Sequence, residues 1–434
     1  MADTPRSTRR QLLKPLQAAA LIREAFRPAP PTRPPPSASP IGAQTGSHLL
    51  SVSREAMACL FEVVFDAASY RHATDVAVAA LQQVALLEDQ LTVYRDTSEV
   101  SAINRRAADE PVAVAQNLYE LLQRGAELAR ITGGAFEMTA GALSKIWGFY
   151  RRQGRMPSPD EIKQALATVG SQHLVFDNHG ENGPTIRFLR RGLELNLSAI
   201  GKGYALDRAA DVLKAANVHD FLLHGGNSSV LASGSRDPKA SRRANAGGVS
   251  QTVVCEDLPS CAAKTTAASA SPSPESAENL AVVAGHEPDT APAAAAPCVS
   301  HDAPQEGWVV GLRHPLRPDV RLAEFVLRDQ ALGTSGSGTQ YFHYQGRRYG
   351  HILDPRTGWP ADKVLSATVI APTAELADAL STACYVLGVE GTRALCQRLP
   401  QIQVLLTVPA RTAGRIELIP IGLAEGSWRL VSPR

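Results

Sequence analysis

Apolar residues recur along the chain at two spacings, one typical of helices and the other of strands. Helical spacing predicts helices over Ala73–Thr92, Val114–Ile131, Gly203–Ala216 and Ala374–Leu387. Short apolar runs predict strands over Met57–Phe65, Phe221–His224, Trp308–Leu312 and Ser366–Ala371. Thr373 is a favourable N-cap for the last helix, and Gly388 follows its predicted end. Helices and strands alternate without a regular βαβ period, so we predict an α+β fold with mixed sheets and helices in a single domain.

Two segments lack this pattern. Residues 27–47 contain seven prolines, which favours an extended linker. Residues 237–306 hold 37 Ala, Ser, Pro and Thr in 70 positions and no aromatic residue, so this stretch cannot bury enough apolar surface to fold. We therefore predict an N-terminal basic and Pro-rich targeting or linker segment (1–47), one domain formed by 48–236 and 307–434, and a disordered insertion (237–306).

The first residues allow two interpretations. Thr8–Lys14 reads T-R-R-Q-L-L-K, which is close to a twin-arginine export signal, and the apolar stretch Leu16–Ile22 follows it. Arg23 and Glu24 interrupt that stretch early, and this favours a short basic amphipathic helix instead.

Composition excludes several classes of protein. The net charge is only +2, so there is no basic excess for binding nucleic acid. No apolar run approaches the roughly 18 residues of a transmembrane helix. Of the six cysteines, none forms a C-x-x-C pair, which argues against a zinc ribbon or a disulfide framework.

The helix after Thr373 carries candidate metal ligands. Asp378 and Thr382 are four residues apart and share one helix face, with Ser381 beside them. A carboxylate and two hydroxyls are hard oxygen donors, which suit Mg²⁺. The alternative is an ordinary solvated helix face.

Three glycine-rich stretches and one histidine add to this picture. Leu195–Tyr204 leads into a helix with Lys202 at its start, where backbone N–H groups favour a phosphate. Gly225–Asn227 ends a strand, and Gly333–Gly338 is rich in backbone donors and hydroxyls, although a flexible loop would look the same. His351 is a candidate general base, the alternative being a packed histidine before a tight D-P-R-T-G turn.

Eight motifs together resemble one known family. They are Leu91–Val100 (L-T-V-Y-R-D-T-S-E-V), Thr132–Thr139 (T-G-G-A-F-E-M-T), Leu143–Phe149 (L-S-K-I-W-G-F), Leu195–Tyr204, His224–Asn227, Gly333–Gly338, His351–Pro360 and Ala377–Gly388 (A-D-A-L-S-T-A-C-Y-V-L-G). In this combination the chain resembles the FAD:protein FMN transferases, the ApbE family. The resemblance spans nearly the whole predicted domain.

The resemblance implies an Mg²⁺-dependent enzyme that cleaves FAD, attaches FMN to a threonine of an acceptor protein and releases AMP. It implies that the FAD site is lined by Met57, Tyr94, Ala135, Phe136, Glu137, Asn196, Lys202 and Ile352. It further implies metal ligation by Asp378, Thr382, Ser381 and the main-chain oxygen of Ala199, and we assign the role of base to His351. The family's targets are often exported or membrane-bound, which favours export of this chain over a cytoplasmic location.

The chain departs from the family pattern at three positions. Asn196 and Glu137 stand where the family commonly has Asp, and Ser381 stands where some members have a second carboxylate. Loss of that carboxylate should weaken Mg²⁺ binding before FAD arrives. Two other functions therefore stay open, namely hydrolysis of FAD to FMN and AMP, and binding of FAD without chemistry. The sequence leaves the acceptor protein and the oligomeric state unknown.

Overall fold

The computed structural model describes residues 49–178, 183–226, 228–236, 307–336, 338, 340–412 and 414–431. These residues belong to one compact unit, Ser47–Arg434, and the description concerns that unit alone. The predictions for residues 1–47 and 237–306 lie outside the described residues, as does Asn227 of the second glycine-rich stretch.

An antiparallel sheet of eight strands forms the centre of the unit. In spatial order its strands are β1 (Leu49–Ala56), β2 (Cys59–Asp66), β6 (Phe221–Gly225), β7 (Ser229–Ser233), β10 (Gln330–Gly336), β13 (Ser366–Ala371), β14 (Gln403–Pro409) and β15 (Ile416–Ile421). All six residues of β13 are buried, because both faces of the sheet are covered at its centre.

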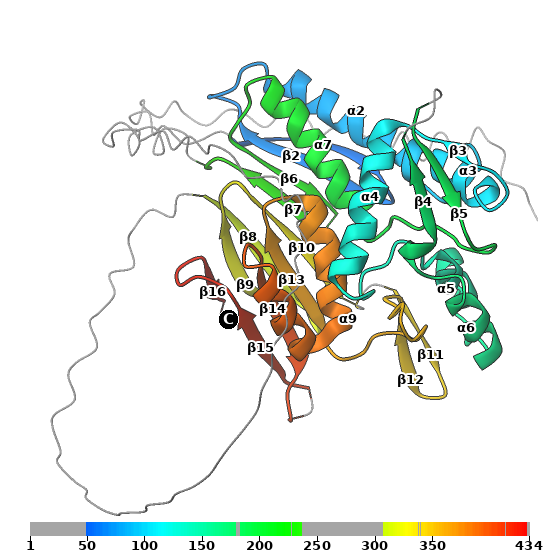
Figure 1. Ribbon diagram of the computed structural model, residues 1–434. Coiled ribbons are helices and arrows are strands. Elements are labelled where there is room, and N and C mark those ends of the chain that lie inside the picture. Colours follow the sequence, from blue (N-terminus) through cyan, green and yellow to red (C-terminus); the bar gives the residue numbers. More distant parts are fainter. Residues whose placement is uncertain are drawn as a thin grey trace, which may run out of the picture. The chain divides into compact units, whose positions relative to one another are not determined.

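Helices cover one face of this sheet and a second sheet covers the other. Figure 1 shows α2 (Ala73–Leu91), α7 (Gly201–Ala215) and α9 (Ala374–Arg398) along the first face, and these helices contact one another and the strands beneath. On the opposite face, side chains of β8 (Trp308–His314), β9 (Arg317–Leu327) and β16 (Trp428–Leu430) form a separate apolar core with the central sheet.

Smaller elements surround the helical side. They are α3 (Glu99–Arg106), β3 (Val112–Ala113), α4 (Gln116–Ile131), α5 (Gly141–Ile146), η1 (Phe149–Arg151), α6 (Pro159–Leu166), η2 (Ser171–His173), β4 (Leu174–Asp177), β5 (Thr185–Phe188), β11 (Tyr341–Tyr344) and β12 (Arg347–Gly350). Strands β3, β5 and β4 form one sheet, and β11 with β12 forms a hairpin. A cluster around Trp147 packs α5 and α6 against this hairpin.

The predicted α+β class is confirmed, and most predicted elements are found within a few residues of their expected limits. The strand expected to begin at Met57 begins at Cys59, because Met57 and Ala58 form the turn of the β1–β2 hairpin with φ of 50° and 58°. The prediction missed β1 and four further strands of the central sheet, β7, β10, β14 and β15. Thr373 caps α9 by accepting the Leu376 N–H, and Gly388 breaks the helix as expected, with φ 72°. A second helical segment follows that break directly, which the prediction did not include.

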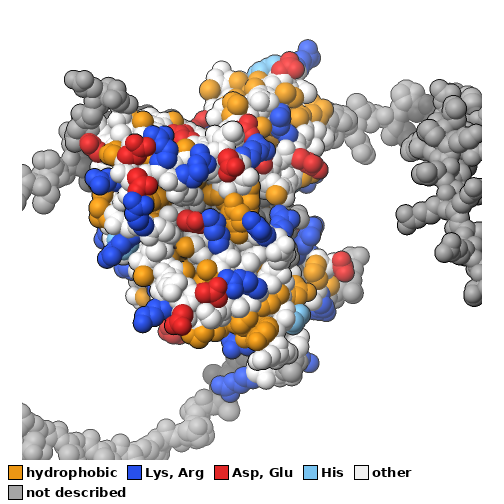
Figure 2. Space-filling view, turned by 90° about the vertical axis from the view of Figure 1, so that its right-hand side faces the viewer, with side chains coloured by type: hydrophobic (Ala, Val, Ile, Leu, Met, Phe, Trp, Pro, Cys, Tyr) orange, Lys and Arg blue, Asp and Glu red, His pale blue; other side chains and the backbone are white. Residues whose placement is uncertain are grey.

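Among the described residues, no helix combines the length and the apolar character needed to cross a bilayer. Figure 2 shows basic and acidic side chains interspersed on the face it presents, without a region of one sign.

Candidate functional site

The carboxylate of Asp378 lies in the interior, where α9 meets α7 and β7. It is 5% exposed, and its two oxygens accept hydrogen bonds from the Gly203 N–H (3.1 Å) and the Ser229 hydroxyl (3.0 Å). Burial raises the pKa of Asp378, and the positive charge of Lys202 partly offsets this rise. The solvated-face interpretation of this helix is therefore wrong, because the Asp378 side chain is buried. A buried carboxylate needs a positive partner to stay ionised.

Two glycines allow the backbones at this site to approach closely. A Cβ at Gly203 would lie 2.1 Å from the Ala374 carbonyl oxygen, and one at Gly333 would lie 2.4 Å from that of Ala377. Both positions bring their element against the first turns of α9. The backbone N–H groups at the start of α7 were predicted to favour a phosphate, but the Gly203 N–H donates to Asp378 instead.

The stretch Gly333–Gly338 is a strand over its first four residues. Gly333–Gly336 belongs to β10 and pairs with β13, so the flexible-loop alternative is wrong there. The Ser335 hydroxyl lies 2.8 Å from that of Ser381 and 3.0 Å from that of Thr382. Ser381 is fully buried and Thr382 is half-buried, whereas Ala199 is half-buried in the turn just before α7. Three of the four predicted metal ligands are thus within one turn of α9.

Lys202 is the charged centre of the site. Its ammonium donates to the Ser228 hydroxyl at 2.5 Å, and its charge acts on Asp378, His351 and Cys59. Figure 1 shows α7 lying next to α9. The Gly203 N–H in the first turn of α7 donates to Asp378. The charge of Lys202 therefore acts on both Asp378 and His351, which lie far from each other in the sequence.

His351 follows the β11–β12 hairpin and is held by the main chain at the N-terminal end of that hairpin. Its Nδ1 lies 3.1 Å from the Gln340 carbonyl oxygen, and its ring meets that of Phe149 edge to face. Burial lowers the pKa of His351, and the Lys202 charge lowers it further, whereas the Gln340 carbonyl opposes the change. The imidazole is therefore neutral at neutral pH. The next residue, Ile352, is buried against the core.

The predicted tight turn after His351 is confirmed. The Gly358 N–H donates to the Asp354 carbonyl at 2.8 Å, and the Gly358 carbonyl accepts from the Trp147 indole. Arg356 makes a bidentate ion pair with the Asp354 carboxylate and lies against Gly134. These contacts fix the loop that carries His351.

Tyr94 offers an exposed aromatic face. It is 66% exposed, and its ring lies against that of Tyr150 with centroids 4.8 Å apart. Tyr150 and Asn196 line a pocket of about 130 Å³, and Tyr94 is not among its lining residues. The Asn196 carboxamide accepts the Ser198 N–H, which shapes the turn before α7.

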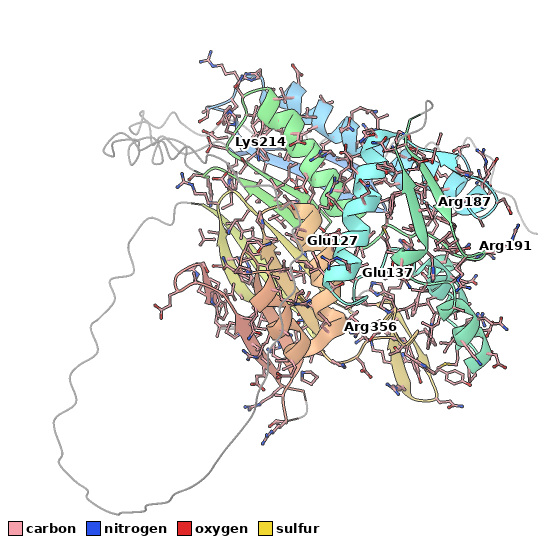
Figure 3. All side chains as sticks on the ribbon, in the orientation of Figure 1. Glu127, Glu137, Arg187, Arg191, Lys214 and Arg356 are labelled. Atoms are coloured by element: carbon pink, nitrogen blue, oxygen red, sulfur yellow. The ribbon has the colours of Figure 1, made fainter. Side chains whose placement is uncertain are left out.

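The remaining predicted FAD-site residues differ in what they can offer a ligand. The side chains of Ala135 and Phe136 are in the core, so only their backbone can face a ligand. Figure 3 labels Glu137, in the loop after α4; its carboxylate accepts four hydrogen bonds from Thr139 and Ser171. Met57 is half-buried in the hairpin turn.

Sequence reasoning missed Ser229, Ser335 and Cys59. Ser335 lies inside the third glycine-rich stretch, whose hydroxyls were noted without assigning a role to this one, and Ser229 follows the second stretch by two residues. Burial raises the pKa of the Cys59 thiol, which lies against Gly226. Only the β2–β6 pairing brings Cys59 there, and no local pattern signals it.

The chain is similar to known proteins in sequence and in fold. Residues 57–268 and 296–406 match the sequence model of the ApbE family. The chain is 30% identical over 349 residues to the FAD:protein FMN transferase of Treponema pallidum, covering 79% of this chain and 80% of that one. It is 27% identical over 333 residues to the protein of the same name from Klebsiella pneumoniae, covering 76% and 81%. A crystal structure of the ApbE protein of Thermotoga maritima superposes with a TM-score of 0.62 at 26% identity, covering 85% of this chain and 96% of that one.

Proposed function

The chain belongs to the ApbE family, and we propose that it is an FAD:protein FMN transferase. The enzyme binds FAD, cleaves the pyrophosphate, and joins FMN through a phosphoester to a threonine hydroxyl of an acceptor protein. AMP is the second product. The name carried by the Treponema pallidum and Klebsiella pneumoniae relatives supports this assignment.

One observation supports the proposal: the Lys202 charge acts on both the buried Asp378 carboxylate and the His351 imidazole, and the N–H of the next residue, Gly203, donates to Asp378. Transfer of a phosphoryl-type group depends mainly on positioning and on neutralising charge. The Lys202 ammonium supplies a fixed positive charge for the FAD pyrophosphate, and Ser228 holds that ammonium in place.

The residues present fit Mg²⁺. Asp378 contributes a buried carboxylate, and Thr382 adds a hydroxyl. In the described part of the chain, no three His, Cys, Asp or Glu side chains gather into a metal site, so the protein's donors here are one carboxylate and neutral oxygens. A hard cation that completes its shell with phosphate oxygens and water matches that set. When bound, Mg²⁺ supplies charge neutralisation and polarisation at the pyrophosphate. Asp378, Thr382 and the Ala199 carbonyl would hold it.

His351 accepts the proton of the acceptor threonine. Because Nδ1 faces the Gln340 carbonyl, Nδ1 carries the hydrogen and Nε2 keeps a free lone pair. The threonine oxygen forms a bond to the phosphorus of the FMN half, and its proton passes to Nε2. The bond from that phosphorus to the bridging oxygen breaks, and AMP leaves with the electron pair.

The test uses the full chain with FAD, Mg²⁺ and a protein known to carry FMN on threonine, supplied without its flavin. We expect covalent flavin on the acceptor, detected by in-gel fluorescence and mass spectrometry, together with one AMP per FMN transferred. The same acceptor with that threonine changed to alanine is the control. Free FMN and AMP produced equally with both acceptors would identify a hydrolase, and intact bound FAD would identify a binding protein.

We further propose that residues 1–47 direct export, which the twin-arginine-like stretch Thr8–Lys14 supports. A fusion of residues 1–47 to an export reporter tests this, with Arg9 and Arg10 both changed to lysine as the control. Equal cytoplasmic retention of both fusions would contradict it.

A further inference from the structure

Three alcohols form a hydrogen-bonded chain between β10 and α9 beside Asp378. The Ser335 hydroxyl lies 3.0 Å from that of Thr382 and 2.8 Å from that of Ser381. The Ser381 hydroxyl in turn lies 2.8 Å from the Asp378 main-chain oxygen. The hydrogen bonds therefore connect Thr382 to Ser335, Ser335 to Ser381, and Ser381 to the Asp378 carbonyl.

The direction of each bond follows from counting protons. A carbonyl only accepts, so the single proton of Ser381 goes to the Asp378 oxygen. The Ser335–Ser381 contact is then made by the proton of Ser335, and the Ser335–Thr382 contact by the proton of Thr382. Thr382 thus donates its hydroxyl proton to Ser335, and its oxygen keeps lone pairs that can face a cation.

The backbone fixes this arrangement. Gly333 brings β10 so close to α9 that a Cβ there would lie 2.4 Å from the Ala377 carbonyl oxygen. Successive strand residues point to opposite faces, so Ser335 faces α9 like Gly333. Thr334, between them, instead bonds the Thr368 hydroxyl on the neighbouring strand at 3.0 Å.

We propose that Ser335 and Ser381 are positioning residues that orient the Thr382 oxygen toward the cation, and that Thr382 is the only one of the three alcohols to ligate it. This rests on the proposed Mg²⁺-dependent transfer, and it departs from the direct ligation of Ser381 that the resemblance implies. Ser381 is fully buried and is hydrogen-bonded to both Ser335 and the Asp378 carbonyl, whereas Thr382 is half-buried and is bonded to Ser335. The two serines set the orientation of a neutral ligand.

Ser335→Ala tests the proposal, with Mn²⁺ as the probe for the cation. The dissociation constant for Mn²⁺ is measured by electron paramagnetic resonance on the full chain saturated with FAD, without an acceptor. Loss of one hydrogen bond that orients a ligand corresponds to a three- to tenfold weaker Mn²⁺ affinity. Thr334→Val is the matched control, because it removes a hydroxyl from the adjacent residue on the other face, and it should stay within twofold of wild type. A Ser335→Ala chain that binds Mn²⁺ within twofold of wild type would overturn the proposal.

A second comparison keeps the test independent of how Ser335→Ala folds. Ser381→Ala should weaken Mn²⁺ binding in the wild type and cause no further loss in a Thr382→Val background, since Ser381 acts only through Thr382. An equal loss in both backgrounds would make Ser381 a ligand in its own right and overturn the proposal. A wild-type chain that binds neither FAD nor Mn²⁺ would instead refute the proposed function. One that binds both, with all variants like wild type, would refute only this inference.

Discussion

Replacing Gly203 by alanine tests how closely α7 must approach α9. A Cβ at this position would lie 2.1 Å from the Ala374 carbonyl oxygen and 2.7 Å from the Glu375 nitrogen, both main-chain atoms that cannot rotate away. Real Cβ atoms keep at least 3.0 Å, so the two helices must separate by about 1 Å. That movement also stretches the 3.1 Å bond from the Gly203 N–H to Asp378 beyond hydrogen-bond length.

The magnitude follows from two opposing terms. Helix propensity alone favours alanine over glycine by about 1 kcal/mol. Overpacking a tight contact costs about 1–3 kcal/mol, and the buried Asp378 loses a donor worth about another 1–3 kcal/mol. We expect a net loss of about 1–5 kcal/mol in the free energy of unfolding and at least a tenfold loss of Mn²⁺ affinity.

Urea unfolding and Mn²⁺ binding in the presence of FAD measure both effects. Gly201→Ala is the matched control, because it lies in the same first turn of α7 and its nearest heavy atom is 3.9 Å from the added Cβ. We expect that variant to be as stable as wild type or slightly more stable. A Gly203→Ala protein with the stability and Mn²⁺ affinity of Gly201→Ala would refute the close-packing argument.

Three further predictions concern charged groups. Asp378→Asn should lower the transfer rate by more than about 100-fold, because the site loses its anionic donor. Chelation of the cation with EDTA should lower the rate of wild type to the same extent. Flavin labelling of the acceptor measures both rates, and undiminished labelling would contradict the metal assignment. Because burial lowers the pKa of His351, the acid limb of the pH–rate profile should lie below pH 6.5. The residual rate of His351→Asn should show no such limb. A limb above pH 6.5 in wild type would count against the role of His351 as base. Burial raises the pKa of Asp207 from 3.8 to about 6, so folding favours its protonated form. As the pH rises from below 4 to above 6, the free energy of unfolding of wild type should fall by about 3 kcal/mol relative to that of Asp207→Asn. Urea unfolding across that pH range measures this, and equal pH dependence of the two proteins would contradict the reasoning.

The local sequence was enough to define the two helices at the site, α7 and α9, but not the strands β7 and β10. Thr373 and Gly388 mark the start and the break of the first segment of α9, because a cap and a residue with positive φ act within a few residues of chain. The spacing of Asp378 and Thr382 also placed them on one side of that helix. By contrast, β1 was missed because most of its residues are exposed and lack the alternation that marks a half-buried strand.

Only the tertiary structure decided what surrounds those residues. The sequence could not tell a solvated helix face from a buried one, since burial of Asp378 depends on α7 and β7 packing against it. It suggested that the glycines cradle a phosphate, whereas Gly203 and Gly333 allow backbones to meet at distances that no side chain permits. The Ser335 hydroxyl lies against α9 through strand pairing and packing between distant parts of the chain. Local free energies fix where helices and strands form, whereas contacts between distant segments decide which of their faces become a site.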